Sequence, residues 1–327
     1  MELESQTVKC QICSQEINKL FTAPCDYRKP TSHRAYDVFF CTSCRYGQVW
    51  PRPTRKEVSS FYDLTDYYTH KADTNSKVGR NSDESFLDRL RFHLSWRLDN
   101  GKDLSPNDAV ALLKGSSFSM LEIGCGNGGN MSRFLDQGFS VVGVEPDQKA
   151  REEAKKSNLI VYEGTAEELP RTVMESKYDV ILMSHVLEHC IDINSAVLNA
   201  KGLLRDRGCF IVETPNCESL GFKAQRAAWP FSDIPRHLNF FTPFSLCAIL
   251  SKHGFSVVSV KYCGFCRQFS NSWLDTEKEV WRAFQGSDDQ WQTEPKYKLQ
   301  AWKLLISSLF SSKEAKYDSV RVIAQLF

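Results

Sequence analysis

The feature that most constrains the fold of this chain is a regular alternation of strand-like and helical segments. It starts after Gly115 and repeats in units of roughly 25 residues. Two neighbouring parallel strands need a crossover connection between them, usually a helix. The alternation therefore predicts an α/β fold with a doubly wound, mostly parallel sheet and helices on both faces. The expected strands of this part are residues 119–123, 140–145, 159–163, 178–184 and 208–214.

The carboxy-terminal part departs from this alternation. Two further expected strands, residues 255–262 and 318–326, are separated by a long helical insert without a clear crossover pattern, so they can pair antiparallel and complete a seven-stranded sheet. The insert, residues 274–312, carries a stripe of large apolar side chains from Trp281 to Phe310. Such a stripe is typical of an ordinary core, but it also fits a dimer face or a surface for lipid-linked acceptors.

Two helices are expected ahead of the first strand of this sheet. One starts after Ser82, where apolar residues recur at helical spacing, and the other starts at Pro106 with Ser105 as its cap. We expect both to cover the sheet edge, and the polar stretch 54–81 to be a connector or lid. The expected organisation is a small module at 1–53, a connector with covering helices at 54–115, and the main domain at 116–327 with its insert at 274–312.

The composition narrows the class of protein. The 327 residues are 42% hydrophobic and carry 41 basic and 40 acidic side chains, for a formal net charge of +1. No run of five like charges occurs, so nothing indicates nucleic-acid binding, and a small or neutral substrate is favoured. The acidic amino terminus does not resemble a signal peptide, and no apolar run approaches the ~18 residues of a membrane span. We therefore expect a cytoplasmic protein without a transmembrane segment.

The amino-terminal module contains two pairs of cysteines, Cys10 with Cys13 and Cys41 with Cys44. A gap of two residues lets both thiolates of a pair reach one tetrahedral ion, and two such pairs complete a closed zinc site. The spacing therefore predicts a zinc-ribbon-like module whose metal is structural rather than catalytic. The alternative is a set of buried reduced thiols, because a cytosolic chain of this size does not keep a disulfide framework.

A glycine-rich turn follows the first strand of the main domain. It contains Gly124, Gly126 and Gly128, with Glu122 just before it and Cys125 within it. Glycine adopts positive φ without a steric penalty, so the main-chain N–H groups of such a turn can approach a ligand closely. The pattern is typical of a nucleoside-binding turn, but it also fits dinucleotide sites, phosphate sites and tight strand-to-helix turns.

An acidic residue follows the second strand. Glu145 lies 21 residues after Gly124 and is followed by Pro146 and Asp147. A carboxylate at this distance can accept hydrogen bonds from ribose hydroxyls, although Pro146 and Asp147 also suit the first turn of a helix. Because ligands bind beyond the carboxyl ends of parallel strands, the segments after the third and fourth strands belong to the same site. They contain Thr165, Ala166 and Glu167, and then Ser184, His185 and His189.

As an ordered series, these segments resemble the class I S-adenosylmethionine-dependent methyltransferases over residues 116 to about 262. The resemblance implies a Rossmann-like methyltransferase fold, with the turn holding the methionine end of the cofactor and Glu145 its ribose. Thr165 stands where the family usually has an aspartate that accepts from the adenine amine, and its uncharged hydroxyl would make a weaker bond. The implied cofactor-binding residues are Glu122, Gly124, Cys125, Gly126, Gly128, Glu145, Pro146, Thr165, Ala166, Glu167 and Ser184.

Residues 185–189 and 234–243 resemble a branch of this family that acts on small molecules, near the ubiquinone-pathway O-methyltransferases. The cysteine module, with Trp50-Pro51-Arg52-Pro53 after its second pair, is similar to a bacterial type found with polysaccharide and secondary-metabolite enzymes. The two resemblances imply methyl transfer to a small-molecule acceptor. We expect a hydroxyl of a sugar, a polysaccharide precursor or a secondary metabolite, and the insert also fits a homodimer.

Three histidines are candidates for catalysis at a hydroxyl acceptor. His185 and His189 follow the fourth strand, and His237 lies in the loop after the fifth. An imidazole with an ordinary pKa can take the hydroxyl proton as a general base. Our hypothesis gives this role to His237, whereas His185 fits packing near the cofactor and His189 fits a cap or a core hydrogen bond. Arg236 fits an anionic acceptor and a structural salt bridge equally well.

Two other functions are compatible with the same sequence. Zinc modules also precede RNA methyltransferases of this fold, but the near-neutral charge and the lack of an Asn-Pro-Pro-aromatic segment after the fourth strand count against one. A non-catalytic cofactor-binding protein is the other alternative, and the intact turn residues count against it. We therefore expect an enzyme with no nucleic-acid partner.

Overall fold

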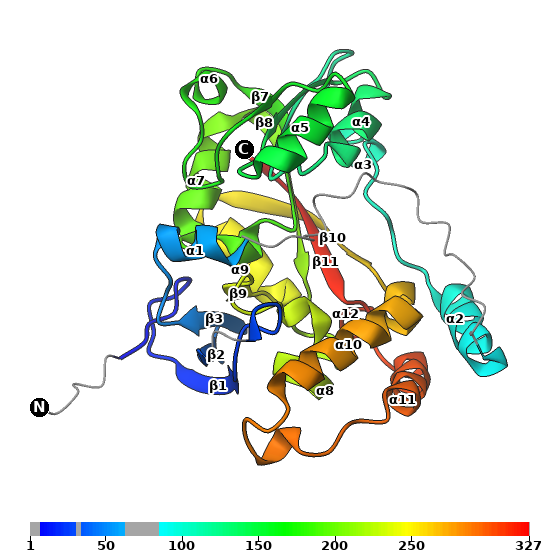
Figure 1. Cartoon of the computed structure of the whole chain (residues 1–327). Coiled ribbons are helices and arrows are strands. Elements are labelled where there is room, and N and C mark those ends of the chain that lie inside the picture. Colours follow the sequence, from blue (N-terminus) through cyan, green and yellow to red (C-terminus); the bar gives the residue numbers. More distant parts are fainter. Residues whose placement is uncertain (1–6, 31–33, 63–84, 327) are drawn as a thin grey trace, which may run out of the picture.

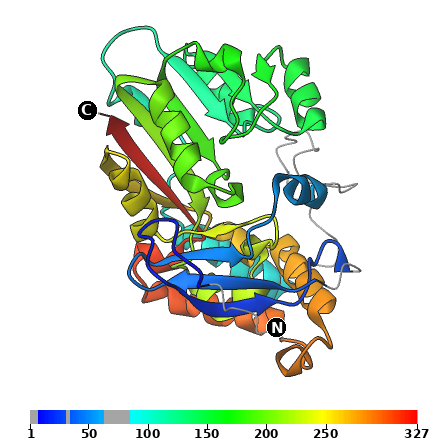
Figure 2. The same cartoon turned by 90° about the vertical axis from the view of Figure 1, so that its left-hand side faces the viewer.

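The computed structural model describes residues 7–30, 34–62 and 85–326. Two β-sheets organise these residues, one of seven strands and one of four (Figure 1). A view turned by 90° shows the larger sheet with its helices stacked above the smaller sheet (Figure 2). Much of the expected connector or lid, residues 63–81, lies outside the described residues.

The larger sheet is built from β4 (Ser119–Ile123), β5 (Ser140–Val144), β6 (Val161–Tyr162), β7 (Tyr178–Ser184), β8 (Leu204–Pro215), β10 (Phe255–Cys263) and β11 (Ser319–Leu326). Its strand order is β10-β11-β8-β7-β4-β5-β6. Strands β4 to β8 pair in parallel, whereas β11 lies between β8 and β10 and pairs antiparallel with both. This arrangement confirms the expected doubly wound, mostly parallel sheet of seven strands.

One strand boundary differs clearly from expectation. β8 begins at Leu204 rather than near residue 208. Its early residues Arg205 and Arg207 are charged and exposed, and only Leu204 pairs with β7 before the register shifts. Because this stretch has no apolar strand pattern, the start of β8 is not visible in the sequence.

Alternate residues of the central strands pack on opposite faces of the larger sheet. Met120 and Val180 belong to one core cluster with Phe134, whereas the next residues, Leu121 and Ile181, belong to the cluster on the other face. Both faces are therefore covered, as a mostly parallel sheet requires. The helices of this domain are α3 (Asn107–Val110), α4 (Gly129–Leu135), α5 (Gln148–Lys156), α6 (Arg171–Met174), α7 (Ile193–Leu203) and α9 (Pro243–Lys252).

The smaller sheet joins the amino-terminal module to the main domain. It contains β1 (Asn18–Ala23), β2 (Tyr36–Cys41), β3 (Tyr46–Trp50) and β9 (Asn239–Phe240), and α1 (Arg55–Phe61) follows it. β1, β2 and β3 form an antiparallel meander, and β9 comes from the main domain to pair with β3. Gly47 permits this close approach, because a Cβ added there would lie 3.0 Å from Cβ of Phe240. The module thus shares a sheet with the domain that follows it.

Three helices share a buried apolar cluster with the smaller sheet: α8 (Leu220–Gln225), α10 (Asn271–Phe284) and α11 (Tyr297–Leu309). α2 (Phe86–Leu98) lies against α11, and α12 (Lys313–Lys316) precedes β11. The apolar stripe of the insert is mostly core, since Trp281, Phe284 and Leu305 are buried in one cluster with Val38 of β2. Phe310, at the end of the stripe, is 88% exposed. A dimer through this end of the insert stays a prediction.

The two helices ahead of β4 occupy different places. α3 packs on the larger sheet through Ala109. α2 contacts α11 and the 3₁₀ helix η6 (Cys266–Phe269), so the expectation that it covers the sheet edge is wrong. Its buried contact is polar, because Arg91 pairs with Asp88 and donates to the carbonyl of Phe269, whereas Phe86 stays exposed. The apolar spacing predicted the helix but not its packing.

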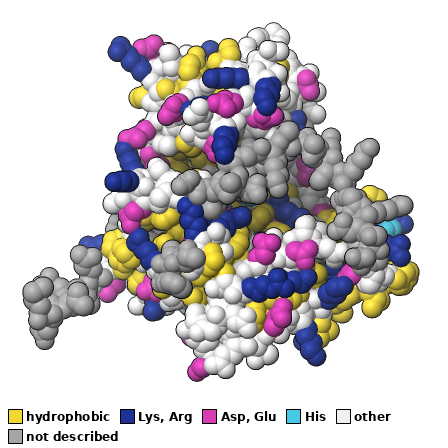
Figure 3. Space-filling view, viewed as in Figure 1, with side chains coloured by type: hydrophobic (Ala, Val, Ile, Leu, Met, Phe, Trp, Pro, Cys, Tyr) yellow, Lys and Arg dark blue, Asp and Glu magenta, His cyan; other side chains and the backbone are white. Residues whose placement is uncertain are grey.

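Among the residues that the structure describes, no helix is long and apolar enough to cross a membrane. On the face shown in Figure 3, basic and acidic side chains are interspersed rather than segregated by sign. This distribution agrees with the nearly balanced charges of the sequence.

Candidate active site

The turn between β4 and α4 presents open backbone at the carboxyl end of the larger sheet. Gly124 and Gly126 have φ angles of 72° and 53°. A Cβ on Gly124 would lie 2.4 Å from Cγ2 of Val186, so this glycine lets the turn lie directly against the segment after β7. A Cβ on Gly126 would meet no atom within 4 Å, which leaves room for a ligand there. Burial raises the pKa of the Cys125 thiol, which packs in a small apolar cluster.

Glu145 lies beside this turn at the end of β5. Its carboxylate accepts from the N–H groups of Gly126 and Asp147, each at 2.9 Å. Burial raises the pKa of Glu145, although these two hydrogen bonds oppose the shift. Asp147 performs the helix-capping role, since it accepts from the N–H groups of Lys149 and Ala150 at the start of α5. Glu145 is therefore not needed as a cap, and its position fits ribose hydroxyls.

Glu122 is buried below the turn with one carboxylate oxygen unsatisfied. The residue is 1% exposed, and its Oε1 accepts from Nδ2 of Asn130 at 2.8 Å. Its Oε2 has no hydrogen-bond partner in the described part of the chain. Burial raises the pKa of Glu122 to about 8, and the nearby charge of Glu145 adds to the rise. A cationic ligand group, such as the ammonium of an amino acid, would satisfy this oxygen.

Glu122→Gln is expected to stabilise the cofactor-free protein at pH 7 by about 1–3 kcal/mol and to weaken cofactor binding about tenfold. The folded pKa of about 8 lies above the ordinary 4.5, so the carboxyl group costs stability as pH rises through this window. The gain in melting temperature should therefore be absent near pH 4 and grow towards pH 8. Calorimetry with S-adenosylmethionine measures the affinity. An equal gain in melting temperature at pH 4 and pH 8 would contradict the raised pKa of Glu122. Glu163→Gln, at an exposed residue, is the control.

The other predicted cofactor residues lie around the same edge with different partners. Oγ1 of Thr165 accepts from the N–H of Glu168 at 3.1 Å and closes a turn after β6. Oε1 of Glu167 accepts from the N–H of Asp192 at 2.8 Å, so this carboxylate is engaged with the segment that starts α7. The remaining four are Gly128, which has a φ angle of 85° at the start of α4, Ala166, which is buried, Ser184, which is partly exposed, and Pro146, which is exposed.

His185 follows β7 and is held between two carboxylates. Its Nδ1 lies 3.1 Å from Oε1 of Glu188, and its Nε2 lies 3.3 Å from Oε1 of Glu213. Burial favours the neutral ring, but the bonds and charges of the two acids outweigh it and raise the pKa of His185 to about 9. Glu213 also pairs with Arg321 of β11 at 2.5 Å. His185 is therefore an imidazolium at neutral pH and is poorly suited to accept a proton.

His189 and His237 lie close together, with ring centroids 4.6 Å apart. Nδ1 of His237 is 2.7 Å from the carbonyl oxygen of Phe231, and Nδ1 of His189 is 3.0 Å from that of Arg236. Because a carbonyl only accepts, each Nδ1 carries a hydrogen, and the lone pair of a ring held in this way lies on Nε2. Burial lowers the pKa of His237 to about 4, and the neighbouring imidazole of His189 adds to this shift. His237 is thus neutral at pH 7.

Asn239 of β9 holds the segment that carries these groups, although the sequence did not single it out. Its side-chain amide donates to the carbonyl oxygens of Leu187, Glu188 and Cys190 at 3.0, 3.3 and 2.7 Å. Its Oδ1 accepts from Oη of Tyr46 on β3 at 2.5 Å. The 3₁₀ helix η3 (Leu187–His189) is therefore fixed by the smaller sheet. Glu188, three residues after His185, was also missed, as were Glu213 and Arg321, whose charges only tertiary packing brings to the site.

Arg236 has a structural role in this arrangement. Its guanidinium is fully buried and pairs with Asp26 at 2.7 Å and Asp233 at 2.8 Å. Arg28 also pairs with Asp233, at 3.1 Å. Of the two roles that the sequence left open, the geometry favours the salt bridge, which ties the amino-terminal module to the loop before β9.

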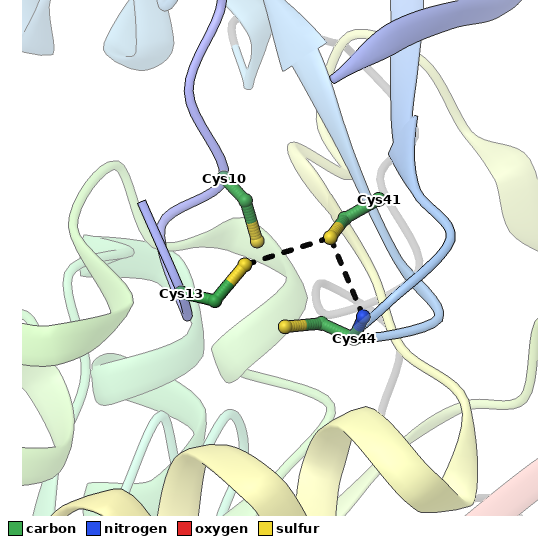
Figure 4. Close-up of side chains that lie close together, drawn as sticks. All are labelled: Cys10, Cys13, Cys41 and Cys44. Carbon is green, nitrogen blue, oxygen red and sulfur yellow. Dashed lines mark hydrogen bonds between the residues drawn. The ribbon is translucent and has the colours of Figure 1, made fainter. Parts of the chain in front are cut away.

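The four cysteines of the module converge on one point (Figure 4). The sulfur atoms of Cys10, Cys13, Cys41 and Cys44 lie within 4.8 Å of one another, and those of Cys13 and Cys41 are 3.6 Å apart. A disulfide is ~2 Å long, whereas a tetrahedron with zinc–sulfur bonds of ~2.3 Å has edges of ~3.8 Å. The N–H groups of Ile12 and Cys44 also point at the sulfurs of Cys10 and Cys41. This donor set fits one zinc ion.

Comparisons with known proteins agree with this geometry. A sequence-family model described as a methyltransferase domain matches residues 85–260, more than half of the chain. The ubiquinone biosynthesis O-methyltransferase of Bartonella tribocorum is 30% identical over 162 residues, which are 46% of this chain and 65% of that protein. The protein of the same name from Rhodopseudomonas palustris is 29% identical over 160 residues, 46% of this chain and 62% of that protein. The chain thus spans less than two thirds of these relatives.

Solved structures of the same class also align with the chain. A S-adenosylmethionine-dependent methyltransferase from Archaeoglobus fulgidus covers 72% of this chain and 94% of its own, with a TM-score of 0.45 and 16% identity. The family match and the strand order, in which an antiparallel β11 lies between β8 and β10, lead to one conclusion. The chain belongs to the class I S-adenosylmethionine-dependent methyltransferases.

Proposed function

We propose that this protein transfers the methyl group of S-adenosylmethionine to a hydroxyl of a small molecule, such as a sugar, a polysaccharide precursor or a secondary metabolite. One observation carries the proposal. Val186 packs against Gly124 of the glycine turn, and the segment that contains it also carries His185 and His189. The histidines are thus held next to the turn that would seat the cofactor. The relatives named as O-methyltransferases support an oxygen acceptor.

The residues around the turn fit the cofactor. Backbone at Gly126 faces open space, Oε2 of Glu122 lacks a partner among the described residues, and Glu145 lies beside both. We assign the methionine end to the turn and Glu122, and the ribose to Glu145. Bound S-adenosylmethionine supplies an activated methyl group, so the protein mainly has to position the acceptor and exclude water.

The acceptor hydroxyl is assigned to the lone pairs of His237 and His189. His237 is neutral at pH 7 because its pKa is about 4, and the carbonyl of Phe231 fixes its hydrogen on Nδ1. His185, in contrast, is an imidazolium at neutral pH, and we assign it the role of orienting Glu188 and Glu213. Loss of the hydroxyl proton at this pair of rings would make the oxygen a better nucleophile.

Cofactor binding is the first test of the proposal. Calorimetry is expected to show micromolar affinity for S-adenosylmethionine, and Glu145→Gln is expected to weaken it at least about tenfold, because a ribose acceptor is lost. Glu163→Gln, an exposed acid on the same edge, serves as the matched control and should bind normally. Labelled methyl uptake is then screened over hydroxylated metabolites and sugar nucleotides. Absence of cofactor binding by the intact chain would overturn the proposal.

His237→Ala is expected to reduce turnover on the identified acceptor by about 10²–10⁴-fold, with little change in cofactor affinity. The reason is that the variant lacks the neutral ring assigned to the acceptor hydroxyl. His253→Ala is the control, since Nε2 of His253 bonds to Asn194 outside the site. Normal turnover of His237→Ala would eliminate the assignment of His237.

A further inference from the structure

A second set of potential metal ligands lies in the described residues, apart from the four cysteines. A carboxylate oxygen of Glu188 and one ring nitrogen each of His189 and His237 lie within 4.8 Å of one another. Glu188 and His189 come from η3 after β7, whereas His237 comes from the loop before β9. Two chain segments therefore bring one acid and two imidazoles to a single point.

The hydrogen bonds of the two histidines are those of metal ligands. A histidine that binds a metal almost always donates its other ring N–H to a carbonyl or carboxylate. Here Nδ1 of His189 donates to the carbonyl of Arg236, and Nδ1 of His237 donates to the carbonyl of Phe231. Oη of Tyr62 also lies 2.8 Å from Nδ1 of His189. The Nε2 atoms are left to act as ligands.

Glu188 supplies an independent observation that points to a cation. Its side chain is completely buried, and Oε1 is held by Nδ1 of His185 at 3.1 Å. Its Oε2 has no hydrogen-bond partner among the residues described. A buried carboxylate oxygen without a partner is costly, and a bound cation would satisfy it. His185 then plays the part of the outer partner that orients a ligating carboxylate.

We propose that Glu188, His189 and His237 bind one divalent transition-metal ion through a carboxylate oxygen and two imidazole nitrogens. Three protein ligands leave coordination positions open, as catalytic metal sites require. The acceptor hydroxyl occupies one of them. This inference rests on the proposed function for its role in catalysis. In it the histidine pair activates the acceptor by holding the ion, so the rings do not take the hydroxyl proton themselves.

The chemical consequence is a more acidic acceptor hydroxyl. A metal-bound oxygen loses its proton more readily, here to solvent water, because the cation stabilises the alkoxide or phenolate. The oxygen then forms a bond to the methyl carbon as the carbon–sulfur bond of S-adenosylmethionine breaks, which leaves S-adenosylhomocysteine as the neutral thioether. The acceptor class is therefore a molecule whose hydroxyl can bind a divalent cation, such as a phenol, a catechol or a sugar diol.

The nature of the ligands separates this site from the cysteine site. Four thiolates select zinc, whereas a site with two imidazoles and one carboxylate also accepts manganese or cobalt. The charged groups outside the site that act on it are His185, beside Glu188, and Asp233, near His237. Asp233 and Arg236 already pair with each other, which leaves Glu188 as the acid with an oxygen free for the ion.

Manganese binding tests the inference without relying on activity. The full chain is treated with a chelator, given one equivalent of Zn²⁺ for the cysteines, and titrated with Mn²⁺ in a calorimeter. One equivalent of Mn²⁺ is expected to bind, and Glu188→Gln and His237→Ala are each expected to weaken binding about 100-fold. His253→Ala should bind Mn²⁺ as the wild type does. Circular dichroism and melting curves confirm that each variant is folded.

The outcomes separate this inference from the proposed function. If the wild type binds no ion beyond the cysteine equivalent, or if both variants bind Mn²⁺ normally, the site does not exist. Full methyl transfer by metal-stripped, zinc-reloaded protein would overturn the inference and leave the proposed function standing, with His237 as an unassisted base. Normal Mn²⁺ binding by a chain that methylates no hydroxyl would support the site and overturn the proposed function.

Discussion

Arg236→Met is expected to lower the free energy of unfolding by about 3–5 kcal/mol. The guanidinium is fully buried and pairs with Asp26 from the amino-terminal module and Asp233 from the loop before β9. Removing it leaves two buried carboxylates with too little positive charge, and only Arg28 remains beside Asp233. Urea unfolding followed by circular dichroism measures the loss. Because Asp26 lies between the cysteine pairs, the module should also detach more readily from the main domain, which limited proteolysis detects.

The matched control for this variant is Arg34→Met. Arg34 pairs with Glu57 on the surface, where both side chains are more than a third exposed. Exposed pairs contribute roughly 0–1 kcal/mol, so this loss should be small. A loss of comparable size in both variants would show that the buried pair is no more important than a surface pair. The triple variant Asp26→Asn, Asp233→Asn, Arg236→Met should recover part of the loss, since it buries no net charge.

Removal of metal from the cysteine site is expected to destabilise the amino-terminal module by about 5 kcal/mol or more. We propose that the four thiolates bind one zinc ion, and this ion would link the Cys10 and Cys41 pairs, which flank β1 and β2. Turnover should fall as well, because Tyr46 of β3 bonds to Asn239, which holds η3. Metal content by mass spectrometry, together with melting curves before and after chelation, measures both effects.

Cys13→Ser is the sharpest variant for this test. Cys13 is the exposed member of the four cysteines, so the change removes a ligand while leaving the core intact. Loss of one zinc equivalent and a lower melting temperature are expected. Cys247→Ser, outside the cluster, should keep both. A Cys13→Ser protein with unchanged metal content and melting temperature would show that the four thiols are ordinary reduced cysteines.

The local patterns of the sequence predicted most of the larger sheet, because each strand carries its own apolar segment and each crossover its own helix. The strand at 178–184 is found with the same bounds as β7. β9 was not predicted, since it has only two residues and exists through its pairing with β3. α2 was predicted as a helix but misplaced, because its position depends on the polar contacts of Arg91 with η6.

Some features of the candidate site could likewise be predicted from the sequence, and others could not. The glycine turn and Glu145 were found from spacing, because their geometry relative to strands β4 and β5 is set by nearby chain. The charge states of the histidines were not predictable. Burial lowers the pKa of His185, but Glu188 and Glu213, the latter from a different strand, outweigh it and raise the pKa to about 9, whereas burial lowers the pKa of His237 to about 4.

The alternating fold, the family, the glycine turn and the two cysteine pairs could be predicted from the chain alone, since each depends on short-range spacing and residue type. Three features appear only in the folded chain: β9 enters the smaller sheet, Arg236 forms a buried ion pair, and Glu188 and His189 meet His237. Each of them joins residues that are far apart in the chain. Their contacts, burial and pKa values exist only once the chain has folded.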